Sequence, residues 1–319
     1  MISKILKTKL NKVLRSQLLP KSSSILIGVS GGQDSLCLAQ LLIFAQVKWD
    51  WKLAIAHCDH KWRKDSTDNA LHVKKLCSDW GLPFLLRTTE TNLNSEAVAR
   101  NWRYQMLTEM AIEANCQIVI TGHTASDRAE TLLYNLARGS GTDGLQSLGW
   151  QRTLSSGIQL IRPLLDISRH ETGEFCQELN LPVWLDSTNQ ILSYKRNRIR
   201  EELIPYLREH FNPNVEKALA QTAELLSADV NYLELQANQF WHTHEPKINR
   251  VDLLQQHLAI QRRATHQFLS YYLPRAPDFN DVQRFLQLLT APGRSQSSPF
   301  AEGWRGEVEH PFIYLRRKH

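Results

Sequence analysis

The chain has 319 residues, of which 42% are hydrophobic and 22% are charged. This is the composition of a soluble globular protein that is long enough for two domains. The formal net charge of +6 at pH 7 favours a polyanionic partner such as nucleic acid. No apolar run approaches the roughly 20 residues of a transmembrane helix, which argues against a membrane role.

The N-terminal residues have the pattern of an amphipathic helix. Ile2, Leu6, Leu10 and Leu14 recur at helical spacing with lysines between them, and the continuous apolar segment of a secretory signal is absent. We expect the apolar stripe to pack on the following domain, with an organellar presequence as the alternative. Five scattered cysteines without a C-x-x-C pair predict reduced thiols and a cytoplasmic location.

A strand, a tight loop and a helix are predicted from residue 25 onward. The apolar run Ile25 to Val29 stops at two glycines, and an apolar-periodic segment follows. The glycines leave backbone N–H groups uncovered where the helix dipole is positive, which is typical of a phosphate site. Asp34 would repel a bare phosphate, so we expect it to bind a Mg²⁺ ion shared with a nucleotide. The predicted phosphate site consists of Ser30, Gly31, Gly32, Gln33, Asp34 and Ser35.

Strands and helices alternate through the next 150 residues. Strands are predicted at 51–57, 84–87, 117–121 and 158–162, and helices at 65–80, 96–115, 125–138 and 168–179. Ser168 and Glu171 have the spacing of a capping box, and the glycine-rich segment 139–157 is predicted to be a loop. This alternation predicts an α/β fold with a doubly wound, Rossmann-like parallel sheet and ligands at the carboxyl ends of its strands.

The pattern changes near Asn212 and Pro213 to almost continuous helix. Helices are predicted at 215–241, at 251–272 with a break near His257, and at 281–289 with Asn280 as cap. We therefore expect a catalytic domain over residues 1–212 and a mainly helical substrate-binding domain over residues 213–319.

Polar side chains follow the predicted strands. His57, Asp59 and His60 suggest either nucleotide contact with strand-end packing or, less well on ligand spacing, zinc. His123, Asp127 and Glu130 are spaced i, i+4 and i+7, which places them on one face. An acidic first helical turn could account for the two carboxylates through the helix dipole alone.

Basic residues occur in two further segments. Arg100 and Arg103 share a helical face, which is typical of a solvated surface, but they are also candidates for neutralising a triphosphate or for binding a carboxylate bidentately. Arg196 belongs to the basic run 194–200, for which a solvated helix face is the alternative.

Several of these segments, between about residues 22 and 207, resemble one family. Ser-Gly-Gly-Gln-Asp-Ser at 30–35 resembles the S-G-G-x-D-S loop of the N-type ATP pyrophosphatases. The segments at 57–63, 99–104, 122–145 and 184–205 resemble those of the tRNA(Ile)-lysidine synthases within that superfamily. Ser126 and Arg128 depart from the family pattern, which commonly has aspartate and glutamine there.

The resemblance implies an adenine nucleotide α-hydrolase-like fold and an ATP-dependent ligation. Free L-lysine would be joined to C2 of the wobble cytidine in the CAU anticodon of tRNA(Ile), through an adenylated cytidine. ATP and Mg²⁺ would be required, and the helical domain would bind tRNA. The sequence leaves the oligomeric state open, a homodimer included.

Roles for the candidate residues follow from the resemblance. Asp34 would hold Mg²⁺, Arg103 and Arg196 would offset developing charge, and His123 would lie beside the nucleotide, while Asp127 and Glu130 would bind the lysine ammonium. Two alternatives remain: a tRNA thiolase of the same superfamily, against which the missing C-x-x-C argues, and a nucleotide- or RNA-binding module without turnover.

Overall fold

The computed structural model describes residues 1–15, 18–62, 65–90, 95–155, 157–185, 195–242 and 244–317. It divides into two compact units, Met1–Leu226 and Ser227–His319. The division lies inside the long helix α10 (Val215–Ala237) rather than at residue 212. That residues 1–212 form the catalytic domain stays a prediction.

A six-stranded sheet forms the centre of the first unit, with the order β3-β2-β1-β4-β6-β5. Five strands are parallel, and β5 pairs antiparallel with β6. Gly28 at the end of β1 is in register with Ala56 of β2 and Thr121 of β4, so the loops after these strands leave one edge of the sheet. The strands are β1 (Ser24–Gly28), β2 (Lys52–Asp59), β3 (Phe84–Thr88), β4 (Ile118–Thr121), β5 (Gln151–Ser155) and β6 (Ile158–Ile161).

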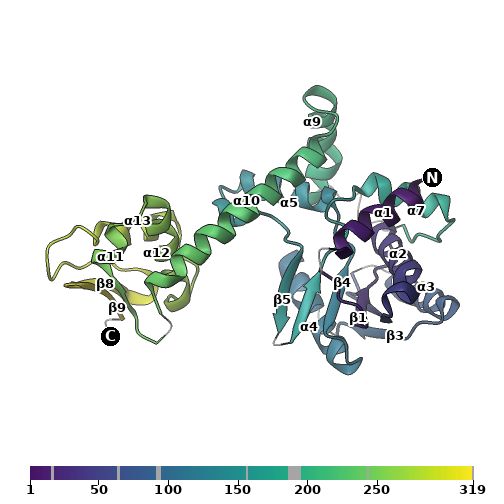
Figure 1. The fold of residues 1–319 in the computed structure, drawn as a ribbon, viewed down its shortest axis with the longest axis horizontal. Helices are drawn as coiled ribbons and strands as arrows, with labels where there is room; N and C mark the ends of the chain where they lie inside the picture. Colours follow the sequence, from purple (N-terminus) through teal and green to yellow (C-terminus); the bar gives the residue numbers. More distant parts are fainter. Residues whose placement is uncertain are drawn as a thin grey trace. The chain divides into compact units, whose positions relative to one another are not determined.

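Helices cover both faces of this sheet (Figure 1), as the doubly wound pattern predicts. Successive side chains of β1 point to opposite faces of the sheet. Ile25 and Ile27 therefore belong to the buried cluster on one face, and Leu26 belongs to the cluster on the other. The first cluster contains residues of α1 (Ile2–Arg15), α2 (Gln33–Trp49), α3 (Ser66–Trp80) and α7 (Arg169–Glu178), and the second contains residues of α4 (Glu96–Glu113).

The remaining helices of the first unit follow β4 and the basic run. They are α5 (Ala125–Ala137), α6 (Thr142–Leu145), α8 (Lys195–Arg198), a π-helical turn at Ile199–Leu203, and α9 (Ile204–His210). The prediction of a loop over 139–157 is wrong for two stretches of that segment, which form α6 and β5. Three of the five residues of β5 are exposed, so the strand lacks the apolar alternation by which strands are recognised.

The amphipathic N-terminal helix packs as predicted. Leu6, Leu10 and Leu14 of α1 are buried in the cluster that contains β1 and α2. The predicted capping box of α7 is also confirmed, since Ser168 and Glu171 each accept a hydrogen bond from the other's backbone. Lys9 of α1 contacts Glu171 at 2.5 Å, which ties α1 to the start of α7.

The second unit is a helical layer against a small sheet. Strands β7 (Lys247–Asn249), β8 (Trp304–Glu309) and β9 (Phe312–Arg317) pair antiparallel. The break near His257 is confirmed: it separates α11 (Arg250–Leu254) from α12 (Leu258–Tyr272). Asn280 does not cap α13 (Phe279–Gln287), because Asp278 and Asp281 form its capping box. No helix among the described residues is long and apolar enough to cross a membrane.

The docking of α1 can be tested with two leucine-sized side chains on the same helix. Leu10 is 2% exposed and Ile5 is 46% exposed. We expect Leu10→Ala to lower the free energy of unfolding by about 2–4 kcal/mol, because it leaves a cavity in the main core, and Ile5→Ala to lower it by less than about 1 kcal/mol. Urea unfolding measures both. Equal losses for the two variants would show that the helix is not packed as described.

Candidate active site

The loop between β1 and α2 is shaped to receive an anion. Gly32 occupies the N-cap of α2, and no side chain among the described residues caps this end, so its first N–H groups point toward the loop. The Ser30 N–H donates to Ser35 Oγ at 3.1 Å, and the Ser35 hydroxyl donates to the Gly32 carbonyl at 2.9 Å. Gly31 has φ of +88°, and a Cβ there would lie 2.4 Å from Asn69 Oδ1. The two serines therefore brace a turn that requires glycine.

Asp34 projects from the first turn of α2 toward α7. Arg169 Nε donates to its Oδ2 at 3.0 Å, and the Thr172 hydroxyl donates to its Oδ1. Burial raises the pKa of Asp34, and the charge of Arg169 opposes that rise. The Gln33 amide donates to the Arg169 carbonyl at 2.7 Å, so its side chain fastens the loop to α7, leaving only its backbone in the predicted phosphate site.

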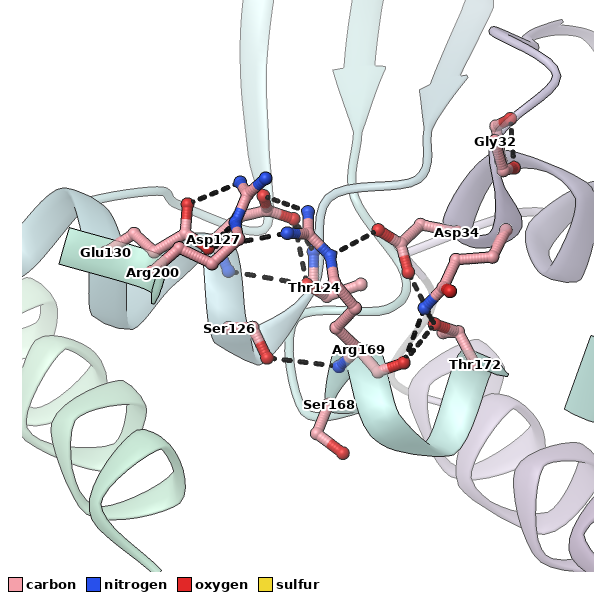
Figure 2. Close-up of polar contacts among 12 residues, drawn as sticks. Gly32, Asp34, Thr124, Ser126, Asp127, Glu130, Ser168, Arg169, Thr172 and Arg200 are labelled. Carbon is pink, nitrogen blue, oxygen red and sulfur yellow. Dashed lines mark hydrogen bonds and ion pairs between the residues drawn. The ribbon is translucent and has the colours of Figure 1, made fainter. Parts of the chain in front are cut away.

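Asp127 and Glu130 lie on α5 and face the same guanidinium (Figure 2). Arg169 lies 3.1 Å from Asp127 Oδ1 and 3.5 Å from Glu130 Oε1. Burial raises the pKa of Asp127, but the charges of Arg169 and His123 and the hydrogen bonds from Thr124 lower it by more. The pKa of Asp127 is therefore lowered overall. Burial raises the pKa of Glu130, although Arg200 binds this carboxylate bidentately at 2.6 and 2.8 Å.

Arg169 thus joins three carboxylates, and the sequence analysis did not single it out. We call these carboxylates the acid cluster: Asp34, Asp127 and Glu130. Arg169 is the first residue of α7, where a cation is disfavoured by the helix dipole. That misplaced charge was the available signal, because it indicates a partner elsewhere. The three neighbouring carboxylates raise the pKa of Arg169, although its burial opposes this.

Four arginines gather separately, and we call Arg100, Arg103, Arg162 and Arg196 the arginine cluster. The pKa of Arg100 is lowered by burial and by the other three charges. Arg196 contacts Glu96 at 3.0 Å, and the buried Nε of Arg103 has no hydrogen-bond partner among the described residues. The predicted residues Arg103 and Arg196 therefore belong to this cluster and do not contact the acid cluster through any described ion pair.

His123 interacts electrostatically with both clusters. It precedes α5, whose N-cap is Thr124, so it is not part of the helix, and its Nδ1 lies 2.9 Å from Thr121 Oγ1. Burial lowers the pKa of His123, the charge of Asp127 opposes this, and arginines of the arginine cluster lower it further. The imidazole is therefore neutral at physiological pH.

His57 lies inside β2 and His60 follows that strand. In the part of the chain that the structure describes, no group of three His, Cys, Asp or Glu residues is placed to hold a metal ion. His57 Nδ1 lies 2.8 Å from the Val29 carbonyl, and Asp59 accepts from the Lys61 N–H at 2.9 Å. Burial lowers the pKa of His60 to about 4. These contacts favour strand-end packing over zinc. Arg63 and Asp186 of the family-like segments lie outside the described residues.

The two departures from the family pattern have separate structural roles. Ser126 Oγ accepts from the Arg169 N–H at 3.0 Å, so it anchors the start of α7. Arg128 is buried and contacts Glu224 of α10 at 2.6 Å, and the Trp150 indole donates to the same carboxylate at 2.9 Å. Arg128 thus binds α10 rather than the acid cluster.

The backbones of Gly122 and Asp34 approach each other closely, and this contact can be tested by substitution. A Cβ on Gly122 would lie 2.9 Å from the Asp34 carbonyl oxygen, whereas one on Gly149 would meet only the Gln151 carbonyl at 3.6 Å. We expect Gly122→Ala to lower the free energy of unfolding by about 1–3 kcal/mol. It should also weaken ATP binding, because the segment from Ser30 to Ser35, which we call the phosphate loop, must shift. Gly149→Ala should change neither by more than about 0.5 kcal/mol. Thermal unfolding and calorimetric ATP titration measure both, and wild-type behaviour of Gly122→Ala would contradict the described contact.

Comparison with known proteins identifies the family. The PP-loop domain matches residues 2–207. The tRNA(Ile)-lysidine synthase of Nostoc sp. PCC 7120 is 51% identical over 98% of this chain and 96% of its own length. That of Synechocystis sp. PCC 6803 is 48% identical over 92% of each chain.

Among solved structures, the tRNA thiolase NcsA from Methanococcus maripaludis aligns with a TM-score of 0.59 at 20% identity, over 71% of this chain and 79% of the thiolase. That likeness shows a shared fold. The resemblance seen in the sequence is confirmed by the closer relatives. The chain belongs to the PP-loop domain family and, within it, to the tRNA(Ile)-lysidine synthases.

Proposed function

We propose that this protein ligates free lysine to C2 of the wobble cytidine of tRNA(Ile) with a CAU anticodon, converting ATP to AMP and pyrophosphate. One observation carries the proposal beyond family membership. The phosphate loop and two further carboxylates meet at a single guanidinium, with Arg169 3.0 Å from Asp34 and 3.1 Å from Asp127. A nucleotide and a cationic second substrate therefore have adjacent places.

The first half of the reaction uses the loop and the arginine cluster. The cytidine O2 attacks the α-phosphorus of ATP, an O–P bond forms, and the bond to pyrophosphate breaks. Backbone N–H groups of Gly32 to Ser35 would hold the departing pyrophosphate at the start of α2. Arg103 and Arg196 supply positive charge for the negative charge that develops.

The donor set fits a Mg²⁺ ion bound together with the nucleotide. Asp34 offers a partly exposed carboxylate in the first turn of α2, next to the loop, and Mg²⁺ in nucleotide sites takes one or two carboxylates with phosphate oxygens. When bound, the ion would neutralise phosphate charge.

The second half needs lysine to be oriented toward C2. Its amine nitrogen attacks C2, the C2–O2 bond breaks, AMP leaves with O2, and the amine loses a proton. Asp127 has a lowered pKa and stays ionised, so it can bind the ammonium, and Glu130 lies one helical turn further along α5. These carboxylates position the amine and also favour its protonated form, so their contribution is orientation.

The alternatives are weakened by the cysteines and the acid cluster. All five cysteines are free, and burial raises the pKa of Cys58 and of Cys77 to about 12, which disfavours the reactive thiolate that a thiolase of the cysteine type requires. Free thiols also agree with a reducing cytoplasm. A module without turnover would not require three largely buried carboxylates around one guanidinium, since each is costly to bury.

The direct test is product analysis. The protein is mixed with ATP, isotopically labelled lysine and a CAU-anticodon isoleucine tRNA transcript, and the wobble nucleotide is examined by mass spectrometry. We expect label at that nucleotide only when both ATP and lysine are present. Sulfur incorporation, or binding of ATP and tRNA without AMP release, would contradict the proposal.

The role of Asp34 can be tested separately. We expect Asp34→Asn to slow pyrophosphate release by about 100-fold or more, because the charge that orients the metal-bound phosphates is lost, while tRNA binding is retained. Asp79→Asn, at an exposed position of α3, is the matched control and should react normally. Normal turnover by Asp34→Asn would refute the assignment of Asp34 to the metal.

A further inference from the structure

Arg169 combines a fixed backbone with an accessible charged end. Its N–H donates to Ser126 of α5 and its carbonyl accepts from Gln33 of α2, so the first turns of two helices hold the main chain. The side chain is 28% exposed, whereas that of Glu130 is 3% exposed. The guanidinium can therefore exchange partners while α7 stays in place.

The three contacts of this guanidinium are unequal. Asp34 and Asp127 lie at 3.0 and 3.1 Å, but Glu130 lies at 3.5 Å. Glu130 also has Arg200 as a bidentate partner, so it stays neutralised when Arg169 leaves. Asp34 lies beside the start of α2, where arriving phosphates would attract a guanidinium further. Movement toward the phosphate loop is therefore the favoured direction.

A third cation cannot easily share Asp127 while Arg169 stays in place, because Arg169 contacts its Oδ1 and Thr124 donates to its Oδ2. Arg169 and Arg200 already face the three carboxylates of the acid cluster. An ammonium placed between Asp127 and Glu130 would lie close to the Arg169 guanidinium, and like charges at such distances are unfavourable in a partly buried site. The ammonium and the guanidinium therefore compete for the same oxygens.

We infer that Arg169 is a positioning residue that makes lysine binding depend on the nucleotide. Without nucleotide, its guanidinium occupies the place of the lysine ammonium on Asp127 and Glu130. With nucleotide, it turns toward the phosphates, which releases Asp127 for the ammonium, while Glu130 keeps Arg200 as a partner. Lysine thus enters after ATP, which keeps the amine away until an adenylated base can form. This inference rests on the proposed function.

The test is calorimetric titration of lysine into the full-length protein, with and without a non-hydrolysable ATP analogue and Mg²⁺. We expect the analogue to tighten lysine binding to the wild type by about 10-fold or more, within the usual range of coupling between sites. Arg169→Gln should bind lysine about 10-fold more tightly than the wild type without nucleotide, and the analogue should then add little. A merely structural defect would weaken binding, so this gain is diagnostic.

Two further variants complete the design. Arg169→Lys keeps a cation and should retain part of the coupling. Arg87→Gln removes an arginine that pairs with Glu113 at the surface and should leave the coupling unchanged. If Arg169→Gln does not fold, the reverse titration of the wild type still tests the inference. Lysine must tighten binding of the ATP analogue by the same factor by which the analogue tightens binding of lysine. Absence of that reciprocal effect would overturn the inference.

The outcomes separate the inference from the function on which it rests. Lysine binding with equal coupling in the wild type and in Arg169→Gln would contradict the inference alone. No lysine binding to either protein, with or without the analogue, would contradict the proposed function and the inference together.

Discussion

Carboxylates buried side by side must share a cation, and this requirement organises the site. Asp34 comes from α2 and Asp127 and Glu130 from α5, yet all three meet the guanidinium of Arg169 (Figure 2). Without that charge, burial and mutual repulsion would drive protons onto the carboxylates. The position of α7, which carries Arg169, therefore determines whether the loop and α5 can form one site.

The fold holds α7 from several directions. Lys9 of α1 binds Glu171, and Gln33 binds the first turn of α7 from the phosphate loop. The sheet supplies the remaining constraint, because β1 and β4 are adjacent parallel strands that end together at Gly28 and Thr121. Their following helices begin at the same edge, which is where ligands bind in folds of this kind. The N-terminal helix thus supports the site without contributing to it directly.

Much of this could be predicted from sequence where the signal is local. The loop at Ser30 to Ser35 follows from its glycines, and the facing of Asp127 and Glu130 follows from helical spacing. The strand β5 was missed because it is an exposed edge strand. The predicted cap of α13 was placed two residues late, because Asp278 and Asp281 supply the capping box on either side of Asn280.

The sequence marks Arg169 only as a cation at an unfavourable helix position, and its partner cannot be found by the same means, because Asp34 lies 135 residues away. A basic residue in the first turn of a helix reads as a surface charge until the carboxylates opposite it are known. Arg103 and Arg196 show the converse: their charge and the family resemblance indicate a role at the phosphates, and they belong to the arginine cluster with Arg100. The sequence shows which side chains are charged, but which of them pair with one another depends on how helices that are distant in the sequence pack together.

The central claim is that the phosphate loop and the acid cluster form one site for two substrates. A crystal structure with a non-hydrolysable ATP analogue, Mg²⁺ and lysine tests it most directly. We expect the β- and γ-phosphates at the start of α2 and the lysine ammonium within hydrogen-bonding distance of Asp127 and Glu130. Lysine bound away from α5, or phosphates held away from the loop, would contradict it.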